Sequence, residues 1–146
     1  MASIMVDTCV LLDVATEDPQ WFRWSESALR QAADSGMLAI NPVIYAELSI
    51  GFGTIEEMES LLSPELFEYR PIPREAAFLA GKSFLKYRRL GGKKSQPLPD
   101  FFIGAHASIE SLPLITRDAR RFRTYFPQLE LISPENGGRG SGREGD

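Results

Sequence analysis

The stretch SIMVDTCVLLD, residues 3–13, decides the fold class of this chain. Its first four residues are small or apolar and end on an aspartate, as a buried strand of a parallel sheet does where it turns into a helix. Residues 10–14 then suit one or two helical turns. A strand followed directly by a helix is the repeating unit of α/β proteins.

The same alternation continues along the chain. Short apolar segments predict strands at residues 3–6, 37–40, 114–116 and 129–132, and residues 66–72 are expected to be extended or a weak strand. Helical patterns occupy residues 10–14, 20–34, 43–52, 54–62, 74–90, 100–111 and 118–124. Hairpin signals are lacking, so we expect a three-layer α/β sandwich, with a central parallel sheet of four or five short strands and helices on both faces. We expect one domain at residues 1–133 and a flexible, low-complexity tail at residues 134–146.

The composition of the 146 residues, 43% hydrophobic and 25% charged, fits a single soluble domain. The one cysteine, Cys9, cannot form an internal disulfide, so nothing requires an oxidising compartment. No apolar run approaches the roughly 20 residues of a membrane span, and the first residues lack the features of a signal peptide. We therefore expect a cytoplasmic protein with no membrane partner.

The net charge of −4 hides two basic clusters. Phosphate backbones are recognised by local basic patches rather than by net charge, although such clusters are also typical of solvated helix faces. The charge pattern therefore permits RNA binding without requiring it. The clusters are Lys82, Lys86, Arg88, Arg89, Lys93 and Lys94, and then Arg117, Arg120, Arg121 and Arg123.

Three aspartates fall where a predicted strand or loop leads into a helix. Asp7 follows the first strand, Asp118 follows a strand with the sequence LIT, and Asp100 follows a proline-rich loop. In α/β sheets such junctions meet at one edge, where ligands bind. Aspartate is also a preferred helix N-cap, so each one alone has a structural explanation. Together they would repel one another unless a cation neutralised them.

A fourth carboxylate, Glu47, lies in the predicted helix over residues 43–52. We expect it on an apolar face, where an unpaired charge is costly. A buried ion pair with an arginine and a protonated acid are alternatives, but a shared metal ion accounts for Glu47 and the aspartates together. Oxygen ligands without His or Cys favour Mg²⁺, or else Mn²⁺, over zinc. The same-face neighbours of Glu47 are Val43, Ile44, Ile50 and Gly51.

Four short motifs carry a resemblance to the PIN-domain family. They are IMVDTCVLLD at residues 4–13, AEL at residues 46–48, LPDFFIGAHA at residues 98–107 and LITRDARRF at residues 114–122. No single motif is decisive, but their order and intervals resemble those of PIN domains over residues 3–132. More narrowly, the sequence resembles the VapC-type toxins of bacterial type II toxin–antitoxin systems.

This resemblance implies a magnesium-dependent endoribonuclease that hydrolyses phosphodiester bonds in RNA and is silenced by a cognate antitoxin protein. It also implies that Glu47 acts through bound water while the three aspartates hold the metal. A homodimer is a further expectation of the family, with residues 43–62 as its candidate surface. The catalytic acids that the resemblance assigns are Asp7, Glu47, Asp100 and Asp118.

Supporting residues follow from the same motifs. Thr8 and Thr116 match positions whose hydroxyls or amides support the acids or a phosphate. Arg117, beside the last acid, could contact a phosphate or steady the carboxylates. Cys9 departs from the family pattern, which often has Ser or Asn there, and a thiol is a weaker hydrogen-bond partner.

Other functions remain compatible with parts of this pattern. A phosphatase of the haloacid-dehalogenase type needs a second aspartate two positions after the first, where this chain has Cys9. A PIN nuclease that is not a toxin, or a non-catalytic scaffold that binds RNA or protein, would keep the fold; four intact acids favour an enzyme. A nuclease that acts on DNA is also compatible with the same residues. We expect His106 to pack or hydrogen-bond locally, and Asp13 to cap a helix or pair with Arg117 or Arg120.

Overall fold

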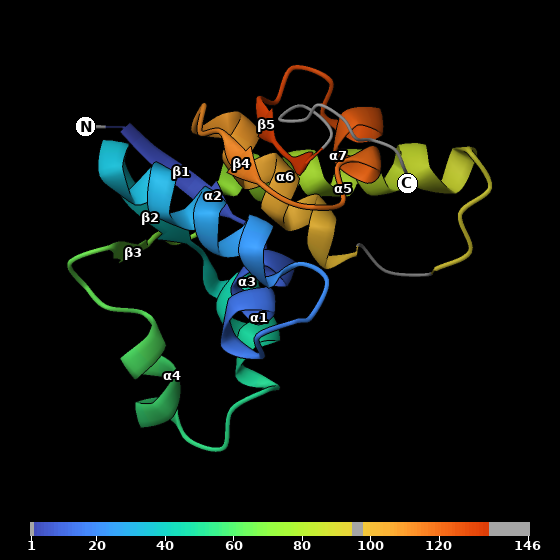
Figure 1. Cartoon of the computed structure of the whole chain (residues 1–146). Coiled ribbons are helices and arrows are strands. Elements are labelled where there is room, and N and C mark those ends of the chain that lie inside the picture. The colour runs from blue at the N-terminus through green and yellow to red at the C-terminus, as the bar shows by residue number, and fades with distance from the viewer. Residues whose placement is uncertain (1, 95–97, 135–146) are drawn as a thin grey trace.

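The computed structural model describes residues 2–94 and 98–134, and a five-stranded parallel sheet lies at its centre (Figure 1). The strand order is β3-β2-β1-β4-β5, and all four neighbouring pairs are parallel. The predicted α/β class and the parallel sheet are confirmed. The strands are β1 (Ala2–Val6), β2 (Gly36–Ile40), β3 (Phe67–Tyr69), β4 (Leu114–Ile115) and β5 (Leu131–Ile132).

Seven helices connect these strands within the described residues. They are α1 (Thr8–Ala15), α2 (Phe22–Ser35), α3 (Pro42–Ser49), α4 (Ile55–Leu61), α5 (Arg74–Arg89), α6 (Pro99–Ile109) and α7 (Arg120–Tyr125). None of these helices is long and apolar enough to cross a membrane. The predicted tail at residues 134–146 lies, apart from Pro134, outside the described residues, and the domain boundary stays a prediction.

The strand order creates a reversal next to β1. From β1 the chain adds β2 and β3 on one side, and then crosses back to add β4 and β5 on the other side. Parallel crossovers are right-handed, so the helices that follow β1 and β2 cover one face and those that follow β3 and β4 cover the opposite face. The carboxyl ends of β1 and β4 therefore form a topological switch point, the usual ligand site of such sheets.

The core is built from the central strands and the helix faces against them. Met5 and Val6 of β1, together with Leu114 and Ile115 of β4, are fully buried, as the near-continuous apolar character of parallel strands requires. Gly104 lets α6 pack closely on α7, because a Cβ there would lie 2.4 Å from the ring of Phe126. This packing fixes the start of α6 beside the switch point.

Candidate functional site

All four predicted carboxylates line one open cleft of about 530 Å³ at the carboxyl end of β1. The sequence placed the three aspartates at separate junctions and Glu47 within a helix, and the structure brings all four together at the switch point between β1 and β4. The supporting residues predicted beside them are mostly there as well. The cleft is lined by Asp7, Thr8, Cys9, Leu12, Glu47, Ile50, Gly51, Asp100, Arg117 and Asp118.

Asp7 is the most deeply placed of these acids, with 6% of its surface exposed. It stands at the N-cap position of α1, but its side chain makes no capping hydrogen bond. Its Oδ2 instead accepts hydrogen bonds from Thr116 Oγ1 at 2.7 Å and from Cys9 Sγ at 3.4 Å. The capping explanation for Asp7 is therefore wrong, and its carboxylate is held in the wall of the cleft.

Thr116 joins two of the acids. While its hydroxyl donates to Asp7, its oxygen accepts the backbone N–H of Asp118 at 3.1 Å. Asp118 is exposed and lies before α7 rather than at its start, because Ala119 is the N-cap residue and α7 begins at Arg120. The prediction that Asp118 opens the helix is thus wrong by two residues. A bend after β4 frees its carboxylate to reach the cleft.

Asp100 reaches the cleft from the start of α6. The helix begins at Pro99, and Leu98 is its N-cap, so Asp100 is the second helical residue and does not cap the helix. Arg121 of α7 donates from Nη1 to Asp100 Oδ2 at 3.3 Å. This contact was not expected from the sequence, although Arg121 stands three residues after Asp118 in the short predicted helix.

Glu47 lines the cleft from α3. It is half-buried, and its Oε1 accepts a hydrogen bond from Thr8 Oγ1 at 2.6 Å. The predicted apolar face around Glu47 is only partly correct, because Ile44 is buried whereas Ile50 is 86% exposed. Ile50 is the C-cap residue directly after the end of α3, and its backbone angles are still helical. The acid with the strongest burial is therefore Asp7 and not Glu47.

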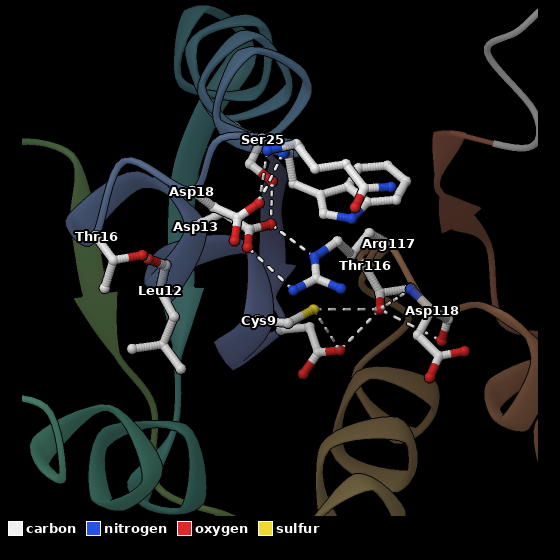
Figure 2. Close-up of polar contacts among 12 residues, drawn as sticks. Cys9, Leu12, Asp13, Thr16, Asp18, Ser25, Thr116, Arg117 and Asp118 are labelled. Carbon is white, nitrogen blue, oxygen red and sulfur yellow. Dashed lines mark hydrogen bonds and ion pairs between the residues drawn. The ribbon is translucent and has the colours of Figure 1, made fainter.

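Arg117 is committed to an ion pair with Asp13. Its Nε lies 2.8 Å from Asp13 Oδ2 and its Nη2 lies 3.1 Å from Asp13 Oδ1, while Ser25 Oγ also donates to Oδ2 at 2.7 Å (Figure 2). Arg117 also stacks over the ring of Trp21, 5.4 Å from its centroid. Of the alternatives expected for Asp13, a helix cap or a pair with Arg117 or Arg120, the structure shows the pair with Arg117. These contacts anchor the loop that carries Asp118 to α1 and α2.

His106 has the structural role that was predicted. It is fully buried, and its Nδ1 lies 3.1 Å from Asn41 Nδ2. Because Asn41 Oδ1 caps α3 by accepting the N–H of Ile44, its Nδ2 must donate, so Nδ1 of His106 is the acceptor and the proton sits on Nε2. Nε2 lies 3.1 Å from Glu110 Oε1 but without hydrogen-bond geometry. His106 thus links α3 and α6 and does not face the cleft.

Burial and mutual repulsion perturb the acids in the cleft. Burial is the largest cause that raises the pKa of Asp7, against the hydrogen bonds from Thr116 and Cys9. Burial first, and then the charge of Asp7, raise the pKa of Asp100 to about 6. Burial also raises the pKa of Cys9 to about 12, so this thiol is a hydrogen-bond donor and not a thiolate nucleophile.

The chemistry of these donors fits a hard divalent cation. The four acids offer oxygen ligands, and burial first, then neighbouring carboxylates, raise the pKa of Asp7 and Asp100, which a bound cation would oppose. Within residues 2–94 and 98–134, however, no three Asp, Glu, His or Cys side chains already converge as a metal-binding group. The site therefore matches a hard cation in its charge and in its type of donor atom, and the acidic side chains would have to move closer together to bind one.

Comparisons with known proteins agree with this fold. Residues 4–127 match the PIN domain family. A VapBC2 structure from Rickettsia felis bound to a promoter DNA fragment has a chain 21% identical, with a TM-score of 0.69, covering 90% of this chain and 98% of that one. A DNA-bound VapBC structure from Salmonella typhimurium has a chain 20% identical, with a TM-score of 0.67, over 91% and 98%.

A third solved structure extends the same pattern. A toxin–antitoxin complex from Klebsiella pneumoniae contains a chain 23% identical, with a TM-score of 0.63, covering 90% of this chain and 97% of that one. At these identities the similarity concerns the fold. No curated protein sequence matches the chain.

Proposed function

The chain belongs to the PIN domain family, and from that premise we propose that it is a metal-dependent endoribonuclease and the toxin of a type II toxin–antitoxin pair. The observation that carries the proposal is the gathering of Asp7, Glu47, Asp100 and Asp118 in one cleft. Similarity to chains from VapBC and toxin–antitoxin complexes supports the toxin role. We propose RNA as substrate, a cognate antitoxin as partner, a homodimer as the assembly and the cytoplasm as the location.

We propose that Asp7, Asp100 and Asp118 hold Mg²⁺, with Mn²⁺ as a substitute. When bound, such an ion acidifies water and neutralises charge that develops on a phosphodiester. Glu47, which lines the same cleft, is suited to orient or deprotonate the attacking water, and Thr8 fixes its carboxylate through the 2.6 Å hydrogen bond. No histidine takes part, because His106 is buried between helices.

The remaining residues of the cleft prepare the acids for this task. Thr116 donates to Asp7 and accepts from Asp118, and so keeps the ends of β1 and β4 in register. Arg117 donates from Nε and Nη2 to Asp13. We propose that its main role is to hold the loop of Asp118 in place and not to bind phosphate. Arg121 neutralises part of the charge of Asp100 in the absence of metal.

The chemistry is tested by incubating the purified chain with RNA and with DNA in Mg²⁺, Mn²⁺ or EDTA. Asp7→Asn and Asp100→Asn should each reduce RNA cleavage by about 100-fold or more, because each removes a charged ligand. A matched control is Glu26→Gln, which removes an exposed carboxylate on α2 and should leave cleavage unchanged. Cleavage that persists in EDTA, or in both aspartate variants, contradicts the mechanism.

The toxin role needs a separate test, because a PIN nuclease with another role would pass the first one. Expression of the wild type should arrest bacterial growth, and Asp7→Asn should not. Co-expression with the product of a small adjacent gene should restore growth if that gene encodes the antitoxin. Growth that continues despite active nuclease would reject the toxin role and leave the nuclease. Specific binding of RNA without any cleavage would instead favour a scaffold.

A further inference from the structure

Charge is strongly segregated in this chain. No acidic residue occurs at positions 76–99 or 119–129, yet these stretches hold nine of the 16 Lys and Arg residues. In contrast, positions 14–68 contain ten acidic residues and only two basic ones, Arg23 and Arg30. The acid-free stretches include most of α5, the start of the following loop and all of α7. Within these two stretches no acidic residue stands between the cations in the sequence.

Contacts between elements join these cations to the cleft. Arg121 of α7 reaches Asp100 at the cleft. One turn further along α7, Lys86 of α5 donates to the carbonyl oxygen of Thr124 at 3.3 Å and lies over the ring of Tyr125. The end of α5 is thereby bound to α7, and Figure 1 shows α7 lying beside α5 and α6. A single surface runs from Asp100 outward to the end of α5.

The loop after α5 is folded back onto that surface. Arg88 Nη1 donates to the carbonyl oxygen of Lys94 at 2.7 Å, and Gly92 N–H donates to the carbonyl oxygen of Tyr87 at 2.9 Å. A Cβ on Gly92 would lie 2.2 Å from the Tyr87 ring, so only glycine fits this close packing without movement. The exposed side chains of Lys93 and Lys94 are thus held near the end of α5.

The other approach to the cleft has the opposite charge. Glu47 sits on α3, which packs against α4, and α4 exposes Glu56, Glu57 and Glu59 to solvent. A polyanion that reached the cleft over α4 would meet carboxylates at each step, whereas over α7 and α5 it meets cations. The asymmetry favours one direction of approach for a phosphate backbone.

We propose that a single strand of nucleic acid lies along the basic face formed by α7, the end of α5 and residues 91–94 as its backbone enters the cleft. The proposal rests on the proposed nuclease function and specifies where its substrate binds. A single strand suits the site because cations at successive positions can follow one backbone. The basic face consists of Lys86, Arg88, Arg89, Lys93, Lys94, Arg120 and Arg121.

The test is the salt dependence of binding between the full chain and a fluorescent single-stranded RNA of mixed sequence, measured by anisotropy in EDTA. Lys93→Gln/Lys94→Gln should reduce the slope of log K against log salt by about 1.4, since each lost phosphate contact removes about 0.7. If the variant and the wild type bind equally at about 1 M salt, this change of slope lowers the affinity for RNA at 0.1 M salt roughly 25-fold. Arg89→Gln/Arg120→Gln should act similarly.

Two matched controls test whether the position of a cation matters and whether the conformation of the loop matters apart from its charge. Arg74→Gln removes an exposed cation from the other end of α5 and should leave the slope unchanged. Gly92→Ala should weaken RNA binding without removing any charge, whereas Gly81→Ala, where nothing lies within 4 Å, should not. A single-stranded DNA of the same length shows whether the backbone alone is recognised. An equal loss on DNA supports the proposal.

The outcomes distinguish this proposal from the nuclease proposal. If both double variants keep the wild-type slope and affinity, the basic face is not the path of the nucleic acid. This holds even if the chain still cleaves RNA, or if an acidic protein binds to the basic face instead. A reduced slope together with a wild-type chain that never cleaves RNA would reject the nuclease function and retain the basic face.

Discussion

Thr116 Oγ1 lies 2.7 Å from Asp7 Oδ2, so a side chain at the end of β4 holds the acid at the end of β1. Thr116 is fully buried, and its oxygen also accepts the backbone N–H of Asp118. One hydroxyl therefore satisfies a buried carboxylate and positions a second acid. The two acids lie 111 positions apart in the chain and are coupled through this single group.

Thr116→Val should remove that coupling at nearly constant volume. The loss leaves a buried carboxylate and a backbone N–H without their partner, so the free energy of unfolding should fall by about 1–3 kcal/mol. Asp7 would also become harder to ionise, and Mn²⁺ affinity measured by calorimetry should decrease. Thr116→Ser keeps the hydroxyl and should retain most of both. Equal metal affinity in the Val and Ser variants would contradict the coupling.

The ion pair between Asp13 and Arg117 should contribute more than an exposed pair. Asp13 is almost fully buried, so Asp13→Asn leaves Arg117 facing a neutral group, and we expect a loss of about 1–3 kcal/mol of unfolding free energy in urea. This is less than for a fully buried pair because part of the Arg117 side chain reaches solvent.

The control for this pair is the exposed one between Glu26 and Arg30 on α2. Glu26→Gln should change the unfolding free energy by less than about 0.5 kcal/mol. If Asp13→Asn is as mild as Glu26→Gln, the Asp13 contact does not anchor the loop of Asp118.

Stability should depend on pH through Asp100. Its pKa is about 6 in the fold against 3.8 for the free group, so between these values the folded state binds more protons than the unfolded state. Stability from this group is therefore greatest below pH 3.8 and falls as pH rises toward 6. In EDTA, Asp100→Asn should raise the melting temperature more at pH 7 than at pH 4.5. An equal change of the melting temperature at both pH values would contradict the raised pKa of Asp100.

Most of the fold followed from the sequence because local patterns determined it. The run before Asp7 is apolar and short, and the structure places it in the centre of a parallel sheet. Arg117 was also one of the two arginines expected as a partner of Asp13, and the structure shows that ion pair. These features depend on neighbours in the chain or on the general rules of parallel sheets.

What the sequence did not reveal depends on contacts between distant segments. Asp7 is more buried than Glu47 because it follows the central strand and is held by Thr116, whereas Glu47 lies on a partly exposed face of α3. The role of Arg121 at Asp100 depends on how α7 packs against α6, and Gly104 sets that distance. Such packing has no local periodicity from which it could be read.

Cys9 should behave as a hydrogen-bond donor within the site and not as a reactive thiol. Its pKa of about 12 keeps it protonated at neutral pH, and its Sγ lies 3.4 Å from Asp7 Oδ2. In the folded chain at pH 8, DTNB should therefore react with Cys9 far more slowly than in urea. Cys9→Ser supplies a stronger donor and should keep or improve Mn²⁺ affinity, whereas Cys9→Ala should lower it. Fast labelling of the folded chain, or equal affinities in the Ser and Ala variants, would show that the thiol does not support Asp7.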